Sequence, residues 1–323
     1  MQKTSVAKKR EKALRKTTFK LLPVVIAIGI IHTLAEAQFL GPQQVNQLPS
    51  SPADHRVHYG SGPLQFGDLR LPQTSGHHPV AVVIHGGCWK SRHGDLIADL
   101  QNTAALSSAL TSLGIATWNI EYRQIDNPGG GWTGTFEDVA NAFDYLRVLA
   151  KTYPLDLKRV VIIGHSAGGH LGTWAAARHR LPKQSPLLSK EPLSVVGVVN
   201  LAGPADLESF LPIQSQVCGE PVITKLIGGS PSEVPDRYRQ ASPSNLLPIR
   251  VKQLLISGAQ DKVVPPWLGQ KYEEEPKKAG DDVTFVVVEN ASHFEVIAPG
   301  SVAWPKIEEA VLSMLKSKKG TSK

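Results

Sequence analysis

The stretch that decides the fold of this chain is Val160-Val161-Ile162-Ile163-Gly164-His165-Ser166-Ala167-Gly168-Gly169. Its four β-branched residues predict a strand that is covered on both faces. A serine follows, between two glycines whose missing side chains leave room for a sharp turn. The residues after the serine are expected to begin a helix. The stretch therefore predicts a strand, a turn and a helix, with Ser166 standing clear of the sheet.

On both sides of this stretch, short apolar runs alternate with amphipathic segments. Strands are expected at residues 80–84, 116–122, 160–163, 195–201, 254–257 and 283–288. Helices are expected at residues 97–113, 135–151 and 302–315. This alternation predicts an α/β fold with a mainly parallel central sheet flanked by helices. Ligands of such sheets bind beyond the carboxyl ends of the strands.

One late segment interrupts the alternation. Residues 203–248 are rich in Pro, Gly and Ser and contain only short apolar patches. A connection of this length inside a compact domain is usually functional, so we interpret it as a cap-like insertion over the sheet. Residues 38–56 have neither helical nor strand periodicity and are expected to form a loose lead-in. The remaining domain is then expected to span residues 57–323.

The N-terminal segment is typical of a secretory signal peptide. Residues 1–37 combine a basic start, an apolar run at residues 21–34 and a small-residue site that ends at Ala37. We expect cleavage after Ala37 and a secreted or periplasmic protein without a membrane span. The alternative is a retained anchor, although the run is shorter than the roughly 20 apolar residues that cross a bilayer.

Composition restricts the possible partners. The chain has 323 residues and a formal net charge of +7. Eight basic and two acidic side chains lie within residues 1–37, so the rest is close to neutral. Nucleic-acid binding therefore has little support. The two cysteines, Cys88 and Cys218, lack the spacing and the histidine partners of a zinc site, and no metal site is expected.

Ser166 is the candidate nucleophile. The amide of Ala167, at the start of the helix, is expected to point at an oxygen that becomes negative during acyl transfer. Further donors are expected from the backbone of Gly86, Gly87 and Cys88, in the run His85-Gly86-Gly87-Cys88-Trp89 after an apolar strand. The alternatives are a serine that only caps a helix and a tight turn with a packed tryptophan.

Chain order selects the other two members of a catalytic triad. His293 follows the last predicted strand on a short polar loop, where a general base has room to reach the serine. Asp261 follows the preceding strand and would hold the imidazole in one tautomer. Asp281, Asp282 and Glu289 are rivals for the acid, and Asp261 itself could be an ordinary turn residue.

These motifs resemble the α/β-hydrolase superfamily, and within it the esterase branch with an HGGxW motif, which includes kynurenine formamidase-like and feruloyl- or acetyl-esterase-like enzymes. The resemblance runs from about Tyr59 to Trp304. It implies hydrolysis of small-molecule esters without a cofactor, with Ser166, Asp261 and His293 as the triad. Cys88 departs from the formamidase-like pattern, in which an aromatic residue often occupies this position.

Three aromatic residues are candidates for the substrate pocket: Trp89, Trp132 and Phe294. Trp132 follows three glycines near the carboxyl end of a strand, and a packed indole is the alternative. A further hypothesis concerns Cys88 and Cys218. In an exported protein they would form a disulfide between the cap-like insertion and the run His85 to Trp89, which we call the oxyanion loop.

The leading hypothesis is an exported serine hydrolase that cleaves carboxylic esters through an acyl-enzyme on Ser166. An amidase, a peptidase or an aryl formamidase with the same triad is the enzymatic alternative. A binding module without catalytic activity is the remote alternative, because a fold alone never establishes activity.

Overall fold

The computed structural model describes residues 39–316, and the predicted signal peptide lies outside these residues. The described part contains an eight-stranded sheet. Its strands, in spatial order, are β1 (His55–His58), β2 (Phe66–Arg70), β6 (Ala116–Ile120), β3 (His78–Ile84), β7 (Leu155–His165), β8 (Gly197–Leu201), β9 (Lys252–Gly258) and β10 (Val283–Val288). From β6 to β10 neighbouring strands are parallel, and β1 and β2 add two antiparallel pairings. The predicted mainly parallel sheet is confirmed.

Strand β3 shows why the strands lack polar alternation. It lies between β6 and β7, and its Val82 is in register with Trp118 and Ile162. Successive side chains of a strand point to opposite faces, so Val80 enters one hydrophobic core and Ala81 the other. Because both faces are covered, each position of β3 favours an apolar residue.

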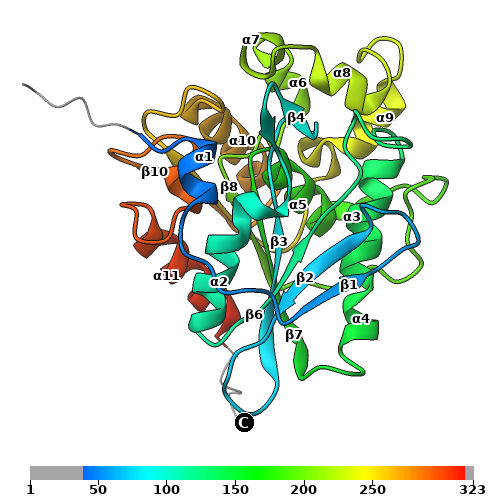
Figure 1. Ribbon diagram of the computed structural model, residues 1–323. Coiled ribbons are helices and arrows are strands. Elements are labelled where there is room, and N and C mark those ends of the chain that lie inside the picture. The colour runs from blue at the N-terminus through cyan, green and yellow to red at the C-terminus, as the bar shows by residue number, and fades with distance from the viewer. Residues whose placement is uncertain (1–38, 317–323) are drawn as a thin grey trace, which may run out of the picture. The chain divides into compact units, whose positions relative to one another are not determined.

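Helices cover both faces of the sheet. They are α2 (Ala104–Ser112), α3 (Gly134–Asp144), α4 (Leu146–Leu149), α5 (Ala167–Ala177), α10 (Pro266–Lys278) and α11 (Trp304–Leu315). Short 3₁₀ turns are η1 (Leu100–Thr103), η2 (Arg178–Arg180), η3 (Pro243–Leu246) and η4 (Glu295–Ile297). In Figure 1, α2 and α11 lie to the left of the sheet and α3 and α4 to its right.

The segment expected as one helix at residues 97–113 is more complex. It begins within a small hairpin of β4 (Arg92–His93) and β5 (Leu96–Ile97) and continues through η1 before α2 starts. Asp99 accounts for this, because its side chain accepts a hydrogen bond from the amide of Gln101 and caps the 3₁₀ turn.

The segment at residues 203–248 folds into short helices between β8 and β9. They are α6 (Leu207–Phe210), α7 (Gln214–Cys218), α8 (Val222–Ile227) and α9 (Pro235–Ala241). Gly219 and Gly228 end α7 and α8 in the left-handed conformation, which keeps these helices short. In Figure 1 the four helices lie at the top of the molecule, above the sheet.

The expectation of a loose lead-in at residues 38–56 is wrong in two places. A one-turn helix, α1 (Pro42–Asn46), lies within it, and β1 already begins at His55. Pro42 is at a position where its fixed φ favours a helix start, and Val45 is buried in the core. A single turn is too short to show a hydrophobic period, so the sequence did not predict it.

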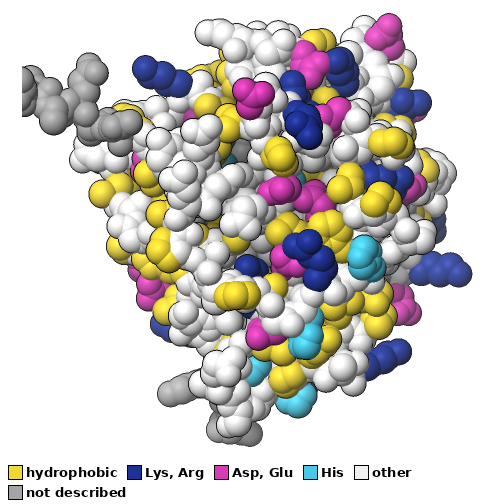
Figure 2. Space-filling view, viewed as in Figure 1, with side chains coloured by type: hydrophobic (Ala, Val, Ile, Leu, Met, Phe, Trp, Pro, Cys, Tyr) yellow, Lys and Arg dark blue, Asp and Glu magenta, His cyan; other side chains and the backbone are white. Residues whose placement is uncertain are grey.

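The surface of residues 39–316 carries charges of both signs. On the face drawn in Figure 2, Lys and Arg side chains lie among Asp and Glu side chains. None of the helices in the described residues is long and apolar enough to cross a membrane.

Candidate active site

Ser166 occupies a sharp turn between β7 and α5. Its φ of 53° and ψ of −120° are strained for a residue with a side chain. Its amide donates a hydrogen bond to the carbonyl oxygen of Leu201 at 2.8 Å. A Cβ on Gly164 would lie 2.0 Å from the oxygen of Gly168, and a Cβ on Gly168 would lie 2.2 Å from that of Ile84. Only glycine therefore fits on either side of the turn.

Asp261 and His293 form a buried pair on the loops after β9 and β10. His293 Nδ1 lies 2.7 Å from Asp261 Oδ2. The other oxygen, Oδ1, accepts hydrogen bonds from the amides of Val263 and Val264, each at 2.8 Å. Because a carboxylate only accepts, the Nδ1 atom carries a proton, and in a neutral imidazole the lone pair is then on Nε2. His293 is therefore in the tautomer that a general base needs.

The rival carboxyl groups have other surroundings. Asp281 accepts hydrogen bonds from the amides of Ile249 and Arg250, at 2.7 and 2.9 Å. Asp282 and Glu289 are exposed at opposite ends of β10. Within residues 39–316, no three His, Cys, Asp or Glu side chains are grouped in a way that could hold a metal ion.

Ser166 and His293 line one cavity of about 230 Å³. The same cavity is lined by Gly86, Gly87 and Cys88 of the predicted oxyanion loop and by Phe294. A larger hollow of about 690 Å³ elsewhere on the surface includes none of these residues. The small cavity is therefore the one that would bring a substrate to Ser166.

The oxyanion loop passes directly beside the nucleophile. A Cβ on Gly86 would lie 2.8 Å from that of Ser166. Gly87, Cys88 and Trp89 follow with φ values of 108°, 50° and 56°. Within the described part of the chain, the amides of Gly87, Cys88 and Ala167 have no acceptor. N–H groups without an acceptor can bind an oxyanion, and the role predicted for these three and for Gly86 stays a prediction.

His85 and Glu121 form a buried ion pair beneath this loop. His85 Nε2 lies 3.0 Å from a carboxylate oxygen of Glu121, and Nδ1 lies 2.8 Å from the carbonyl oxygen of Gly86. Burial alone would lower the pKa of His85. Glu121 and the Gly86 carbonyl raise this pKa by more than burial lowers it, so it lies above its ordinary value. Both ring nitrogens can then donate, which fixes the start of the loop. The sequence showed His85 only as the first residue of the HGGxW motif and carried no signal for this role.

His165, the residue before Ser166, holds the backbone of His293. Its Nε2 atom donates to the carbonyl oxygen of His293 at 3.0 Å, and the two ring centroids are 4.7 Å apart. Burial keeps the pKa of His165 well below its ordinary value, so the ring stays neutral. The only signal in the sequence was its place within the serine motif.

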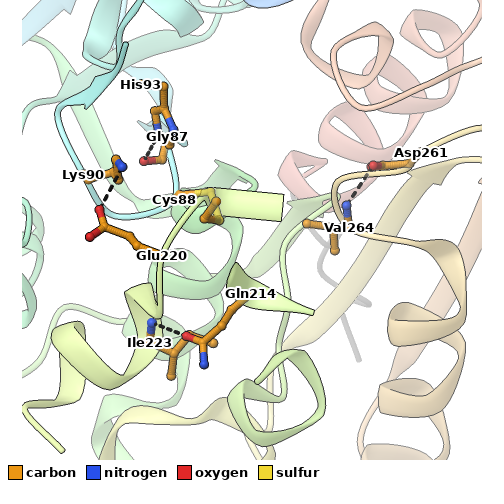
Figure 3. The surroundings of a disulfide bond; sticks show 10 residues. Gly87, Cys88, Lys90, His93, Gln214, Glu220, Ile223, Asp261 and Val264 are labelled. Carbon is orange, nitrogen blue, oxygen red and sulfur yellow. Dashed lines mark hydrogen bonds and ion pairs between the residues drawn. A yellow bond between two sulfur atoms is a disulfide. The ribbon is translucent and has the colours of Figure 1, made fainter. Parts of the chain in front are cut away.

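Cys88 and Cys218 form a disulfide that joins the oxyanion loop to α7, with Cα atoms 5.9 Å apart (Figure 3). Beside it, Lys90 Nζ lies 2.8 Å from a carboxylate oxygen of Glu220. Hydrogen bonds from Lys225 and Lys90 lower the pKa of Glu220 to about 2. The disulfide thus connects the oxyanion loop to α7, and the ion pair connects Lys90, the residue after that loop, to the turn after α7.

Two of the three aromatic pocket candidates lie outside the cavity. Trp89 is only 1% exposed, and its indole N–H donates to His170 Nδ1 at 3.1 Å. The positive φ of Trp89 accompanies a turn that places its ring in the core. Trp132 packs edge-on against Phe136, and the Arg237 guanidinium lies over its ring at 5.9 Å. Both indoles therefore stabilise the fold by packing, because a large ring contributes most to stability when it is buried.

The cavity also has walls that contain none of the predicted site residues. They come from α1, the β4–β5 hairpin and α7, and include Pro42, Leu96, Ile97 and Val217. These apolar residues belong to no motif, so the sequence carried no signal for them.

Comparison with known proteins places the chain in a family. Residues 68–275, more than half of the chain, match the family described as BD-FAE. The chain belongs to the BD-FAE family. The BD-FAE match includes Ser166 and Asp261 and ends before His293.

Among curated proteins, this BD-FAE chain is similar to Esterase LipC of Mycobacterium tuberculosis (strain ATCC 25618 / H37Rv). The two are 28% identical over 214 residues, which are 65% of this chain and 51% of LipC. The chain thus spans about half the length of that relative.

Solved structures show the fold of this BD-FAE chain. Esterase B from Lactobacillus rhamnosis, with a tributyrin phosphonate inhibitor, has a TM-score of 0.68 and 20% identity, with 84% of this chain and 90% of that chain covered. A truncated carbohydrate esterase from gut microbiota has a TM-score of 0.65 and 22% identity, with 82% and 96% covered. The predicted α/β-hydrolase fold, of an esterase branch, is confirmed.

Proposed function

We propose that the protein hydrolyses carboxylic esters through an acyl-enzyme on Ser166. One observation carries this proposal: a single cavity collects a serine on a strained turn, a histidine paired with a buried aspartate, and a loop with free backbone donors. The names of LipC and of the structural relatives, which are called esterases, agree with it.

In the first half of the reaction, His293 Nε2 takes the proton of the Ser166 hydroxyl as its oxygen attacks the ester carbonyl. The carbonyl oxygen becomes negative and is bound by the free amides near Ser166. Asp261 stabilises the imidazolium that forms. The bond to the alcohol then breaks, and His293 returns the proton to the leaving alcohol.

In the second half, water replaces the alcohol. His293 takes a proton from this water as the water oxygen attacks the acyl carbon. The bond to Ser166 then breaks, and the proton passes to the serine oxygen. The acid leaves, and the enzyme returns to its starting state.

The proposed substrates are small and uncharged. The cavity has a volume of about 230 Å³, which is below the range of about 300–1,000 Å³ for pockets that hold drug-sized ligands. Among the described residues that line it there is no Lys, Arg, Asp or Glu. Apolar groups of a short ester would fit this lining, whereas a charged group would lose its hydration without a partner.

The test is the replacement Ser166→Ala with p-nitrophenyl acetate as substrate. We expect kcat to fall by about 10⁴-fold or more, because the nucleophile is lost. Near-UV circular dichroism checks that the variant is folded. Turnover equal to that of the wild type would refute the proposal.

Two further measurements separate the alternatives. A fluorophosphonate probe should label Ser166 in the wild type, and a folded protein that does not react would be a binding module. The matched amide p-nitroacetanilide should be cleaved much more slowly than the ester. Faster cleavage of the amide would favour an amidase.

We also propose that the protein is exported and cleaved after Ala37. The signal-peptide pattern of residues 1–37 supports this, and a disulfide between Cys88 and Cys218 is typical of an oxidising compartment. Sequencing the N-terminus of protein from the culture medium or periplasm tests it. Gln38 is the expected first residue, and an intact N-terminus in the membrane fraction would support the anchor.

A further inference from the structure

Residues 39–47, which we call the N-terminal strap, cross the surface beside the catalytic cavity. Helix α1 forms the centre of the strap and lies next to α2 (Figure 1). We propose that the strap is a wall of the substrate site and that Pro42 determines which esters enter it. This inference rests on the proposed function, because it concerns the specificity of the same site.

The strap is fastened at three points. Val45 is 2% exposed and belongs to the core between the sheet, α2 and α11. The side-chain amide of Asn102, on η1, donates to Asn46 Oδ1 at 2.7 Å. The backbone amide of Leu40 donates to a carboxylate oxygen of Glu295 at 2.5 Å. A short segment with this many buried contacts has a defined position.

One of these fastenings also holds the catalytic loop. The second carboxylate oxygen of Glu295 accepts a hydrogen bond from the amide of Ser292 at 2.8 Å. Ser292 directly precedes His293, and Glu295 is only 6% exposed. A single buried carboxylate therefore joins the strap to the loop of the general base.

Pro42 brings the strap into the cavity. It lines the same space as Ser166 and His293, together with Ile97 of the hairpin and Val217 of α7. Its ring has a fixed φ, so the wall cannot easily move aside. In so small a cavity, a rigid ring excludes groups that a flexible or smaller side chain would admit.

The strap lies outside the part of the chain that matches the family. The family match begins at residue 68, so Pro42 and Asn46 lie outside it. The strap contains no charged residue, so its wall is neutral. This agrees with an uncharged substrate.

The experiment is the substitution Pro42→Ala in the full chain, with two substrate series. In one, p-nitrophenyl esters lengthen from acetate to octanoate; in the other, the acetyl group is constant and the alcohol grows from methyl to naphthyl. For each series we take the ratio of kcat/KM for the largest ester to kcat/KM for the smallest ester. We expect this ratio to be about tenfold higher in Pro42→Ala than in the wild type, in at least one series. This ratio does not depend on how much of the sample is folded.

Two variants accompany this measurement. Asn46→Ala leaves Pro42 in place but removes the bond that joins the strap to Asn102, which also lines the cavity, and we expect its ratio to shift in the same direction. Pro49→Ala removes an exposed proline just beyond the strap, and its ratio should equal that of the wild type. Unchanged ratios in both series for Pro42→Ala would overturn the inference.

Ser166→Ala, measured in parallel, separates the two proposals. If this variant is as active as the wild type, the proposed function fails. If activity depends on Ser166 but the Pro42→Ala ratios are those of the wild type, only the role of the strap fails.

Discussion

At the scale of single residues, the pairing of Asp261 with His293 determines which imidazole nitrogen can act. Asp261 Oδ1 is committed to two backbone amides, and Oδ2 accepts the Nδ1 proton of His293. The carboxylate therefore cannot rotate freely. The orientation of His293 therefore depends on Val263 and Val264, whose two N–H groups donate to one oxygen of Asp261.

We predict that Asp261→Asn lowers kcat for p-nitrophenyl acetate by about 10⁴-fold with little change in KM. The amide oxygen of asparagine would take the place of Oδ1, where two N–H groups point, and its NH₂ group would face His293. The imidazole then carries its proton on Nε2 and cannot accept one from Ser166. Asp282→Asn, at an exposed position, is the matched control. Equal kcat values for the two variants would contradict this role.

At the scale of elements, the oxyanion loop is held from outside. Cys88 and Trp89 have positive φ, a conformation that costs about 1–3 kcal/mol per residue and persists only where the surroundings enforce it. The disulfide to α7 and the ion pair of Lys90 with Glu220 provide such surroundings. Helix α7 and the turn after it thus support the backbone conformation of this loop.

We predict that removal of the disulfide lowers both activity and stability. In the double variant Cys88→Ala with Cys218→Ala, kcat should fall about tenfold, because the donors are no longer held at the oxyanion. The free energy of unfolding should fall by about 2–5 kcal/mol, since a loop of 130 residues is no longer closed in the unfolded chain. Guanidinium unfolding and steady-state kinetics measure the two effects.

Reduction of the wild type with a phosphine is the complementary experiment. It should reproduce the loss of activity seen in the double variant and leave the double variant itself unchanged. A phosphine effect of equal size on both proteins would show that the disulfide is not its cause.

At the scale of the whole molecule, two cores on opposite faces of the sheet exclude water from several histidines. Burial lowers the pKa of His170 to about 4. His170 accepts from the indole of Trp89 and donates to the carbonyl oxygen of Ala241, so it links the oxyanion loop to α9 in its neutral form. His165 is neutral for the same reason.

These shifts predict a loss of stability in weak acid. An unfolded histidine has a pKa of about 6.5, so between pH 6.5 and 4 the side chain of His170 binds more protons in the unfolded chain than in the native one. The contribution of His170 is complete above about pH 6.5 and is lost as the pH falls to about 4, a difference of about 3 kcal/mol. His85, whose pKa is raised, acts in the opposite direction.

Guanidinium unfolding at pH 7 and pH 4.5 tests this prediction. His170→Gln, which can keep both hydrogen bonds but does not titrate, should show a smaller decrease than the wild type. His77→Gln, at an exposed position, is the control. A decrease in His170→Gln as large as that of the wild type would show that His170 is not responsible.

The sequence by itself determined the strands, the turn of Ser166 and the order of the candidate triad. Each depends on local physics: covered strands need apolar residues, and the turn needs Gly164 and Gly168 because a side chain there would meet backbone oxygens. Asp261 and His293 followed from the order in which parallel strands deliver their loops to one edge of the sheet.

Only the tertiary structure decided what surrounds the nucleophile. Pro42 and Val217 come from segments far apart in the sequence, and nothing local indicates that they share a cavity with Ser166. Trp89 adjoins the oxyanion residues, but its backbone conformation and its bond to His170 place the ring in the core. Motifs encode chemistry through local backbone shape, whereas a pocket wall is the result of packing between distant segments, and packing is decided only when the whole chain has folded.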